Sequence, residues 1–75
     1  MDFPPFFIFT DMVTINGKQY EVSGKTIAAY LAEAKYDLQR VAVELNGEIV
    51  SKGKLAETVM QDGDVMEVVS FVGGG

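Results

Sequence analysis

Cysteine and histidine are both absent from this 75-residue chain. Their absence excludes disulfide frameworks, metal sites built on thiolates or imidazoles, and nucleophilic catalysis by Cys-His or Ser-His pairs. The sequence also has no charged segment that leads into a long apolar run and a small-residue cleavage site. We therefore expect no signal peptide, no membrane association, no bound metal and a cytoplasmic location.

The length and charge of the chain restrict its architecture and its partners. An apolar fraction of 48% indicates a core, and 75 residues are enough for one small domain but not for an additional lid or cofactor domain. Eleven acidic residues against six basic ones give a net charge of −5. Because the basic residues are scattered, a phosphate backbone would be repelled, and nucleic acid is not an expected partner.

Residues 1–11 differ in composition from the rest of the chain. They read MDFPPFFIFTD, with two adjacent prolines that oppose a helix and an apolar run too short to span a membrane. This leader has no assigned role; an expression remnant, a misassigned start and an added edge strand all remain open. We take residues 12–72 as the domain and residues 73–75 as a flexible glycine tail.

Alternating apolar residues predict two hairpins. Residues 13–15 and 20–22 alternate on either side of Asn16-Gly17, which is a strong signal for a two-residue hairpin turn. Residues 41–45 alternate in the same way, and Asn46-Gly47 then turns the chain into a short strand at residues 48–50.

Helical periodicity lies between and after these hairpins. Thr26 is suited to cap a helix, and residues 54–60 are suited to one or two further helical turns. Asp62-Gly63-Asp64 then forms a turn into a last strand at residues 65–71. The apolar residues of the first helix follow spacings of three and four: Ile27, Tyr30, Leu31, Ala34 and Leu38.

This order of elements predicts an α+β fold of the β-grasp, or ubiquitin-like, type: a roll with a mixed sheet of four to five strands packed on one main helix. In this arrangement the last strand lies centrally, beside the first. With Met66, Val68 and Ser70 facing the helix, alternation turns the other side chains of this strand outward. The result is an exposed, largely apolar stripe that we interpret as a docking surface: Val65, Glu67, Val69 and Phe71.

Three other groups of residues carry weaker signals. Residues 47–54 resemble a phosphate loop, but their glycines are one residue too far apart and Leu55 replaces the magnesium-binding Ser or Thr. Residues 62–67 lack the carboxylate spacing of a calcium loop, so a turn is favoured. Lys52 and Lys54 are candidates to pair with acids of a partner, although exposed lysines more often only solvate a surface.

The end of the sequence carries the candidate active group, the main-chain carboxylate of Gly75. Gly73 and Gly74 have no side-chain bulk, so they can thread a narrow slot in a partner's active site. We expect partner docking by Val69, Phe71 and Val72, immediately before this tail. The alternative is that the terminal glycines are a frayed end or an expression scar.

The segment VELNGEIVSKGKLAETVMQDGDVMEVVSFVGGG, residues 43–75, resembles the ThiS-type sulfur carriers of bacterial thiamine biosynthesis, a ubiquitin-like family related to MoaD. The resemblance rests on the conjunction of the aspartate turn, the last strand and Gly74-Gly75, and it covers residues 12–75. Ser51 and Leu55 depart from the proline and the bulky aromatic residue that this family often has. The leader has no counterpart in the family.

The resemblance implies that the protein is not an enzyme but a cosubstrate. A ThiF-like adenylating enzyme would activate the carboxylate of Gly75 with ATP and magnesium, and the carrier itself would bind no cofactor. A persulfide sulfur donor would then displace AMP to give a thiocarboxylate, and a ThiG-like thiazole synthase would consume the sulfur. Two alternatives stay open: the small sulfur-carrier subunit of molybdopterin synthase, and a ubiquitin-like modifier or interaction domain.

Overall fold

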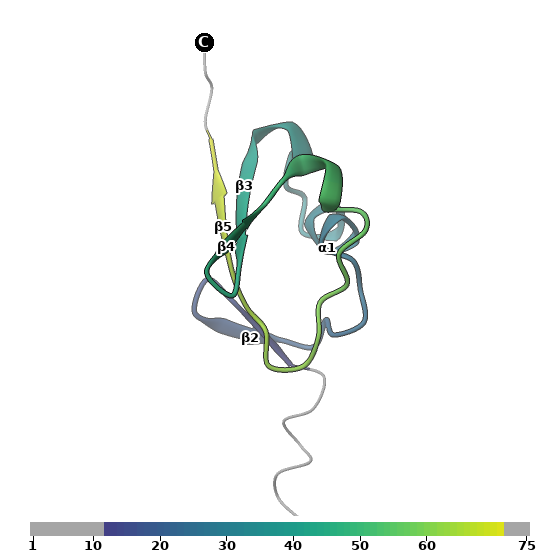
Figure 1. Cartoon of the computed structure of the whole chain (residues 1–75), viewed down its shortest axis with the longest axis vertical. Helices are drawn as coiled ribbons and strands as arrows, with labels where there is room; N and C mark the ends of the chain where they lie inside the picture. The colour runs from purple at the N-terminus through teal and green to yellow at the C-terminus, as the bar shows by residue number, and fades with distance from the viewer. Residues whose placement is uncertain (1–11, 72–75) are drawn as a thin grey trace, which may run out of the picture.

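The computed structural model describes residues 12–71, which form a mixed five-stranded sheet and one α-helix (Figure 1). The strand order is β2-β1-β5-β3-β4, so the last strand is the central one. The elements in this part of the chain are β1 Val13–Ile15, β2 Lys18–Tyr20, α1 Ile27–Glu33, the 3₁₀ helix η2 Leu38–Arg40, β3 Val41–Leu45, β4 Glu48–Val50, the 3₁₀ helix η3 Lys52–Lys54 and β5 Val65–Ser70.

The pairing of β5 determines the topology. It runs parallel to β1 on one side and antiparallel to β3 on the other, while the two hairpins β1-β2 and β3-β4 form the outer pairs. The predicted β-grasp fold is therefore confirmed, including the placement of the last strand beside the first.

Both predicted Asn-Gly turns are present, and their backbone angles explain the residue choice. Asn16 and Gly17 have φ angles of 51° and 86°, and Asn46 and Gly47 have 52° and 87°. These left-handed conformations suit asparagine followed by glycine in a tight hairpin. The first hairpin is shorter than predicted: β2 ends at Tyr20, whereas a strand reaching residue 22 was expected.

Helix α1 begins where the sequence predicts. Thr26 is the N-cap, and its Oγ1 accepts a hydrogen bond from Ala29 N at 3.1 Å. The helix ends at Glu33, and Lys35 has a φ of +70°, which stops the helical path. The spacing of apolar residues had placed Leu38 in α1. Because α1 ends earlier, Leu38 instead packs against the core from η2.

The prediction of one or two helical turns over residues 54–60 is correct for one turn only, in which Lys54 O accepts from Glu57 N and Thr58 N at 3.0 Å. The 3₁₀ helix η3 lies just before this turn, and the segment that follows η3 bonds to the start of α1. Ile27 N donates to Thr58 O at 3.0 Å, and Ala28 N donates to Leu55 O at 2.9 Å. Because these carbonyls satisfy the free N–H groups of the first turn of α1, they are not used for a longer helix of their own.

The core lies between α1 and the inner face of the sheet. Its residues come from alternate strand positions, from one face of α1 and from the segment after η3. Ten apolar residues among those described are buried: Val13, Ile15, Ile27, Leu31, Val41, Val43, Leu55, Met60, Met66 and Val68.

Candidate functional site

Strand β5 carries the chain through the middle of the sheet toward the glycines (Figure 1). Its pairing with the segment before β3 continues one residue beyond the strand, because Phe71 N donates to Arg40 O at 2.7 Å. Phe71, the last described residue, is therefore held by a main-chain hydrogen bond. The predicted site residues Val72, Gly73, Gly74 and Gly75 lie outside the described residues.

The predicted outward stripe is present on β5. Val65 is 46% exposed, and Val69 and Phe71 are each 55% exposed, while Met66 and Val68 between them are buried. Ser70 is paired with the buried Val41, so it lies on the inner face as expected, although it is exposed at the last position of the strand. Val69 and Phe71, two of the three predicted docking residues, are thus accessible on one face next to the exit of the chain.

The outer face extends beyond the stripe that the sequence indicated. Ile49 on β4 is 77% exposed, and it lies opposite Glu44 of β3, which in turn lies opposite Glu67 of β5. Ile49 was not among the predicted docking residues, although an isoleucine at the centre of a short predicted strand that follows a hairpin turn indicates an apolar side chain on one face of the sheet. This part of the outer face contains a hollow of about 200 Å³. Its lining residues are Ala42, Val43, Glu44, Ile49, Glu67 and Val69.

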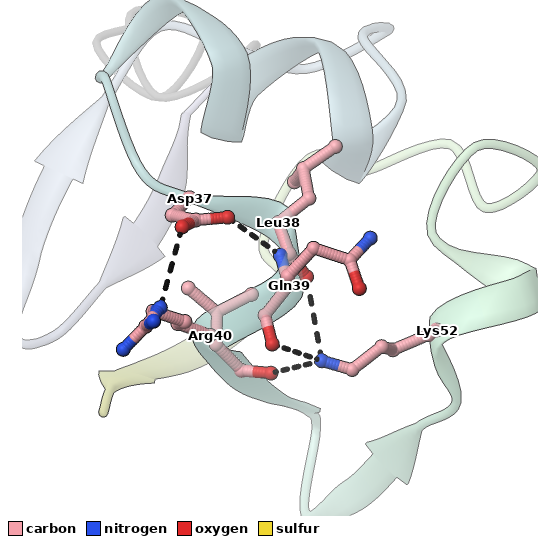
Figure 2. A network of polar contacts seen from close by, with 6 residues as sticks. Asp37, Leu38, Gln39, Arg40 and Lys52 are labelled. Atoms are coloured by element: carbon pink, nitrogen blue, oxygen red, sulfur yellow. Dashed lines mark hydrogen bonds and ion pairs between the residues drawn. The ribbon is translucent and has the colours of Figure 1, made fainter. Parts of the chain in front are cut away.

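Lys52 has a structural role beside η2 (Figure 2). Its Nζ donates to the carbonyls of Leu38 at 3.4 Å, Gln39 at 3.1 Å and Val41 at 3.5 Å. These carbonyls belong to the first two residues of η2 and to Val41, the residue after it, so one ammonium group contacts three partly negative oxygens. Lys52 therefore fixes the segment whose Arg40 carbonyl binds Phe71.

The start of η2 is capped, as Figure 2 shows. Asp37 Oδ1 accepts a hydrogen bond from Gln39 N at 2.9 Å, and Asp37 Oδ2 lies 3.6 Å from Arg40 Nε. Lys54 is the second lysine that was considered for contact with a partner, and its Nζ lies 3.6 Å from Glu57 Oε1. Asp37 and Lys52 thus contact the segment whose Arg40 carbonyl accepts the hydrogen bond from Phe71.

The aspartate turn is structural. Asp64 Oδ2 accepts from Gln61 N at 2.8 Å, and Asp64 Oδ1 accepts from Asn46 Nδ2 at 3.0 Å. The side chain of Asp64 therefore joins the turn before β5 to the turn between β3 and β4. Within residues 12–71, no three acidic side chains gather in a way that could hold a metal ion. The same residues include no helix with the length and apolarity needed to cross a bilayer.

The central last strand, the two flanking hairpins and the single covering helix define a β-grasp protein, and the sequence after its last strand is glycine-rich. The sequence model of the ThiS family matches residues 13–75. The chain belongs to the ThiS family.

The relatives of this chain include a protein matched over its full length and a much longer one. The sulfur carrier protein ThiS of Thermus thermophilus is 39% identical over 64 residues, which are 85% of this chain and 100% of that protein. A thiazole synthase of Paramagnetospirillum magneticum is 44% identical over 64 residues, but these are only 20% of that protein's length. The crystal structure of the thiamine biosynthesis protein ThiS from Geobacter metallireducens superposes with a TM-score of 0.69 at 34% identity, covering 85% of this chain and 99% of that one.

Proposed function

We propose that this protein is a sulfur carrier in thiamine (thiazole) biosynthesis, with the carboxylate of Gly75 as the group that carries sulfur. The observation that carries the proposal is the match to the ThiS family, which extends through the terminal glycines to residue 75. The Thermus thermophilus relative, named a sulfur carrier protein, is matched over its whole length. The central position of β5 gives the tail a fixed starting point at Phe71.

The proposed chemistry takes place in the active sites of partners. A carboxylate is a poor electrophile, so a ThiF-like adenylating enzyme joins the Gly75 carboxylate to the AMP part of ATP, with magnesium, and pyrophosphate leaves. The terminal sulfur of a persulfide donor then attacks the acyl carbon and AMP leaves. A thiol splits the resulting S–S bond and leaves a thiocarboxylate on Gly75. The carrier is the cosubstrate of these steps and contributes no catalytic residue or cofactor.

The carrier's own contribution is geometric. Gly73 and Gly74 provide a tail that enters a narrow active site, while Val69, Phe71 and Val72 dock on the partner. Holding the reacting group in a defined place relative to the partner's catalytic groups is a large source of rate enhancement. The main-chain bond between Phe71 and Arg40 supports this role by fixing the point from which the tail extends. Because activation consumes ATP, the cytoplasm is the proposed compartment.

A ThiG-like thiazole synthase is the proposed acceptor of the sulfur. The support is that the Paramagnetospirillum magneticum protein named thiazole synthase contains a region 44% identical to this chain, so carrier and synthase sequences occur in one polypeptide there. The family match favours this acceptor over molybdopterin synthase. No observation favours the ubiquitin-like modifier.

The test is an intact mass spectrum of the full chain after incubation with a ThiF-like adenylating enzyme, ATP, magnesium and a persulfide donor. We expect replacement of one oxygen by sulfur, located at Gly75 by fragmentation. The matched control is the chain without Gly74 and Gly75, which should keep its circular dichroism spectrum and lose all loading. Unchanged loading after this deletion, or lysine adducts in place of a thiocarboxylate, would contradict the proposal.

A further inference from the structure

Two carboxylates of like charge lie directly opposite each other on the outer face of the sheet. Glu44 of β3 is paired in register with Glu67 of β5, and both side chains are exposed. Like charges at directly opposed positions destabilise an antiparallel pair. Neither carboxylate takes part in an ion pair among residues 12–71. Both carboxylates are therefore left without a charged partner in the described part of the chain.

The acid pair has apolar neighbours. Ile49 lies opposite Glu44 on the next strand, and Ala42 and Val69 form the neighbouring cross-strand pair on the same face. These residues line the same hollow as the two glutamates. Aliphatic side chains beside a carboxylate exclude water when a partner covers them, which strengthens any charge contact made there.

We propose that Glu44, Glu67, Ile49 and Val69 form an acid-pair subsite that receives an arginine of the thiazole synthase during sulfur transfer. This inference rests on the proposed function for the identity of the partner. Charge complementarity selects the occupant: a guanidinium has five donors in a planar fork and can bridge two neighbouring carboxylates. Arginine is also enriched in the buried centres of protein interfaces, where its aliphatic stem packs on apolar side chains.

Strand β5 contributes Glu67 and Val69 to the subsite and leads into the tail. A contact between an arginine and the subsite therefore also positions the tail. Glu67, Val69 and Phe71 follow one another at alternate positions on the same face. Four residues of antiparallel strand separate Glu67 from Phe71 by roughly 13 Å. An arginine held at Glu44 and Glu67 therefore fixes the direction of β5 against the synthase, and with it the point from which the glycines enter the active site.

A solvated sheet face and a docking subsite predict different combinations of stability and affinity. In both cases Glu44→Gln or Glu67→Gln relieves the cross-strand repulsion, so the melting temperature of the free chain stays equal or rises. Only a subsite loses affinity at the same time. A Glu-to-Gln substitution that keeps or raises the melting temperature but lowers the affinity for the synthase therefore identifies a carboxylate that contacts the partner.

The experiment is titration calorimetry of the full chain against purified thiazole synthase of the same organism, at low and at physiological ionic strength. We expect each single variant to bind about tenfold more weakly, as for the loss of a charged hydrogen bond. The double variant should lose most of the salt dependence of binding. Glu21→Gln is the matched control, since it removes the same charge from an exposed position that does not line the hollow.

Three results would overturn the subsite: affinity within twofold of wild type for the double variant, an equal loss in Glu21→Gln, or no binding of the wild-type chain to the synthase. Thiocarboxylate loading of every variant is measured in parallel by intact mass, because loading does not involve the synthase. Normal loading with unaltered binding rejects the subsite alone. Absent loading of the wild-type chain rejects the proposed function and the partner named here with it.

Discussion

The side-chain amide of Asn16 exchanges two hydrogen bonds with the main chain of Val68. Val68 N donates to Asn16 Oδ1 at 2.8 Å, and Asn16 Nδ2 donates to Val68 O at 3.2 Å. The parallel ladder between β1 and β5 ends at Ile15 and Met66, and the amide continues it as a peptide group would. The turn residue of the first hairpin therefore also holds the strand that leads to the tail.

Asn46 has the same double role in the second hairpin. Its Oδ1 accepts a hydrogen bond from Val65 N at 2.9 Å, while its main-chain N donates to Val65 O at 2.7 Å. The two Asn-Gly turns thus contact β5 from opposite sides. Substitutions at either asparagine are expected to act on β5 as well as on the local turn.

Asn16→Gly is predicted to destabilise the protein by about 1–3 kcal/mol, the usual cost of leaving main-chain groups without their partners. Glycine accepts the φ of 51° without strain, so the loss reports the two hydrogen bonds to Val68 together with the larger entropy of glycine in the unfolded chain. Urea unfolding followed by circular dichroism measures it. Gln19→Ala, an exposed change on β2, is the control and should stay within about 0.5 kcal/mol of wild type. Equal stability of Asn16→Gly and wild type would contradict the account.

Lys52→Met is predicted to lower the free energy of unfolding by about 1 kcal/mol, because three carbonyls of the η2 region lose a charged donor. Amide exchange at Phe71 should become faster, since its hydrogen-bond acceptor belongs to Arg40 in that region. Hydrogen exchange followed by NMR provides both readings. Lys54→Met removes only an exposed ion pair with Glu57 and should change neither. The same exchange rate in both variants would refute the role of Lys52.

Phe71→Asp is predicted to leave the fold intact and to weaken binding of the adenylating enzyme or the thiazole synthase by tenfold or more, about the loss for a central interface residue. Phe71 is 55% exposed, so its removal opens no cavity in the core. Val68→Asp, three residues earlier and 7% exposed, should instead unfold the domain because it buries an unpaired charge. Calorimetry and circular dichroism separate the two effects. Unaltered affinity of Phe71→Asp for both partners would remove Phe71 from the docking surface.

Stability is predicted to fall at alkaline pH through Tyr30. Burial, and then the neighbouring Tyr36 and Tyr20, raise the pKa of Tyr30 above its ordinary value of 10.0. The folded state therefore holds this proton more tightly than the unfolded chain does. The contribution of the protonated Tyr30 to the free energy of unfolding is full below pH 10. It is lost as the pH rises from there through the folded-state pKa. Urea unfolding at increasing pH measures the decline, which should be shallower in Tyr30→Phe. Parallel declines in both proteins would contradict this assignment.

Local features of the sequence predicted most of the backbone. The two Asn-Gly turns, the cap at Thr26 and the alternation around Met66 all depend on conformational preferences that extend over only a few residues. The error at residues 54–60 arose because distant segments compete for the same groups. Residues 54–60 form no more than one helical turn because the carbonyls of Leu55 and Thr58 accept from the start of α1, about thirty residues earlier in the chain. The spacing of apolar residues within a segment contains no information about hydrogen-bond donors from a distant part of the chain.

The sequence by itself determined the five strands and the main helix, their order, the sidedness of β5 and the glycine tail that follows it. These follow from side-chain spacing and from the freedom of glycine, which are properties of short stretches of chain. Only the tertiary structure decided that Glu44 faces Glu67 beside Ile49, and that Asn16 bonds to Val68, 52 residues away. Strand register between distant segments is fixed by packing of the whole core, because a slip by one residue would move every apolar side chain of β5 to the opposite face.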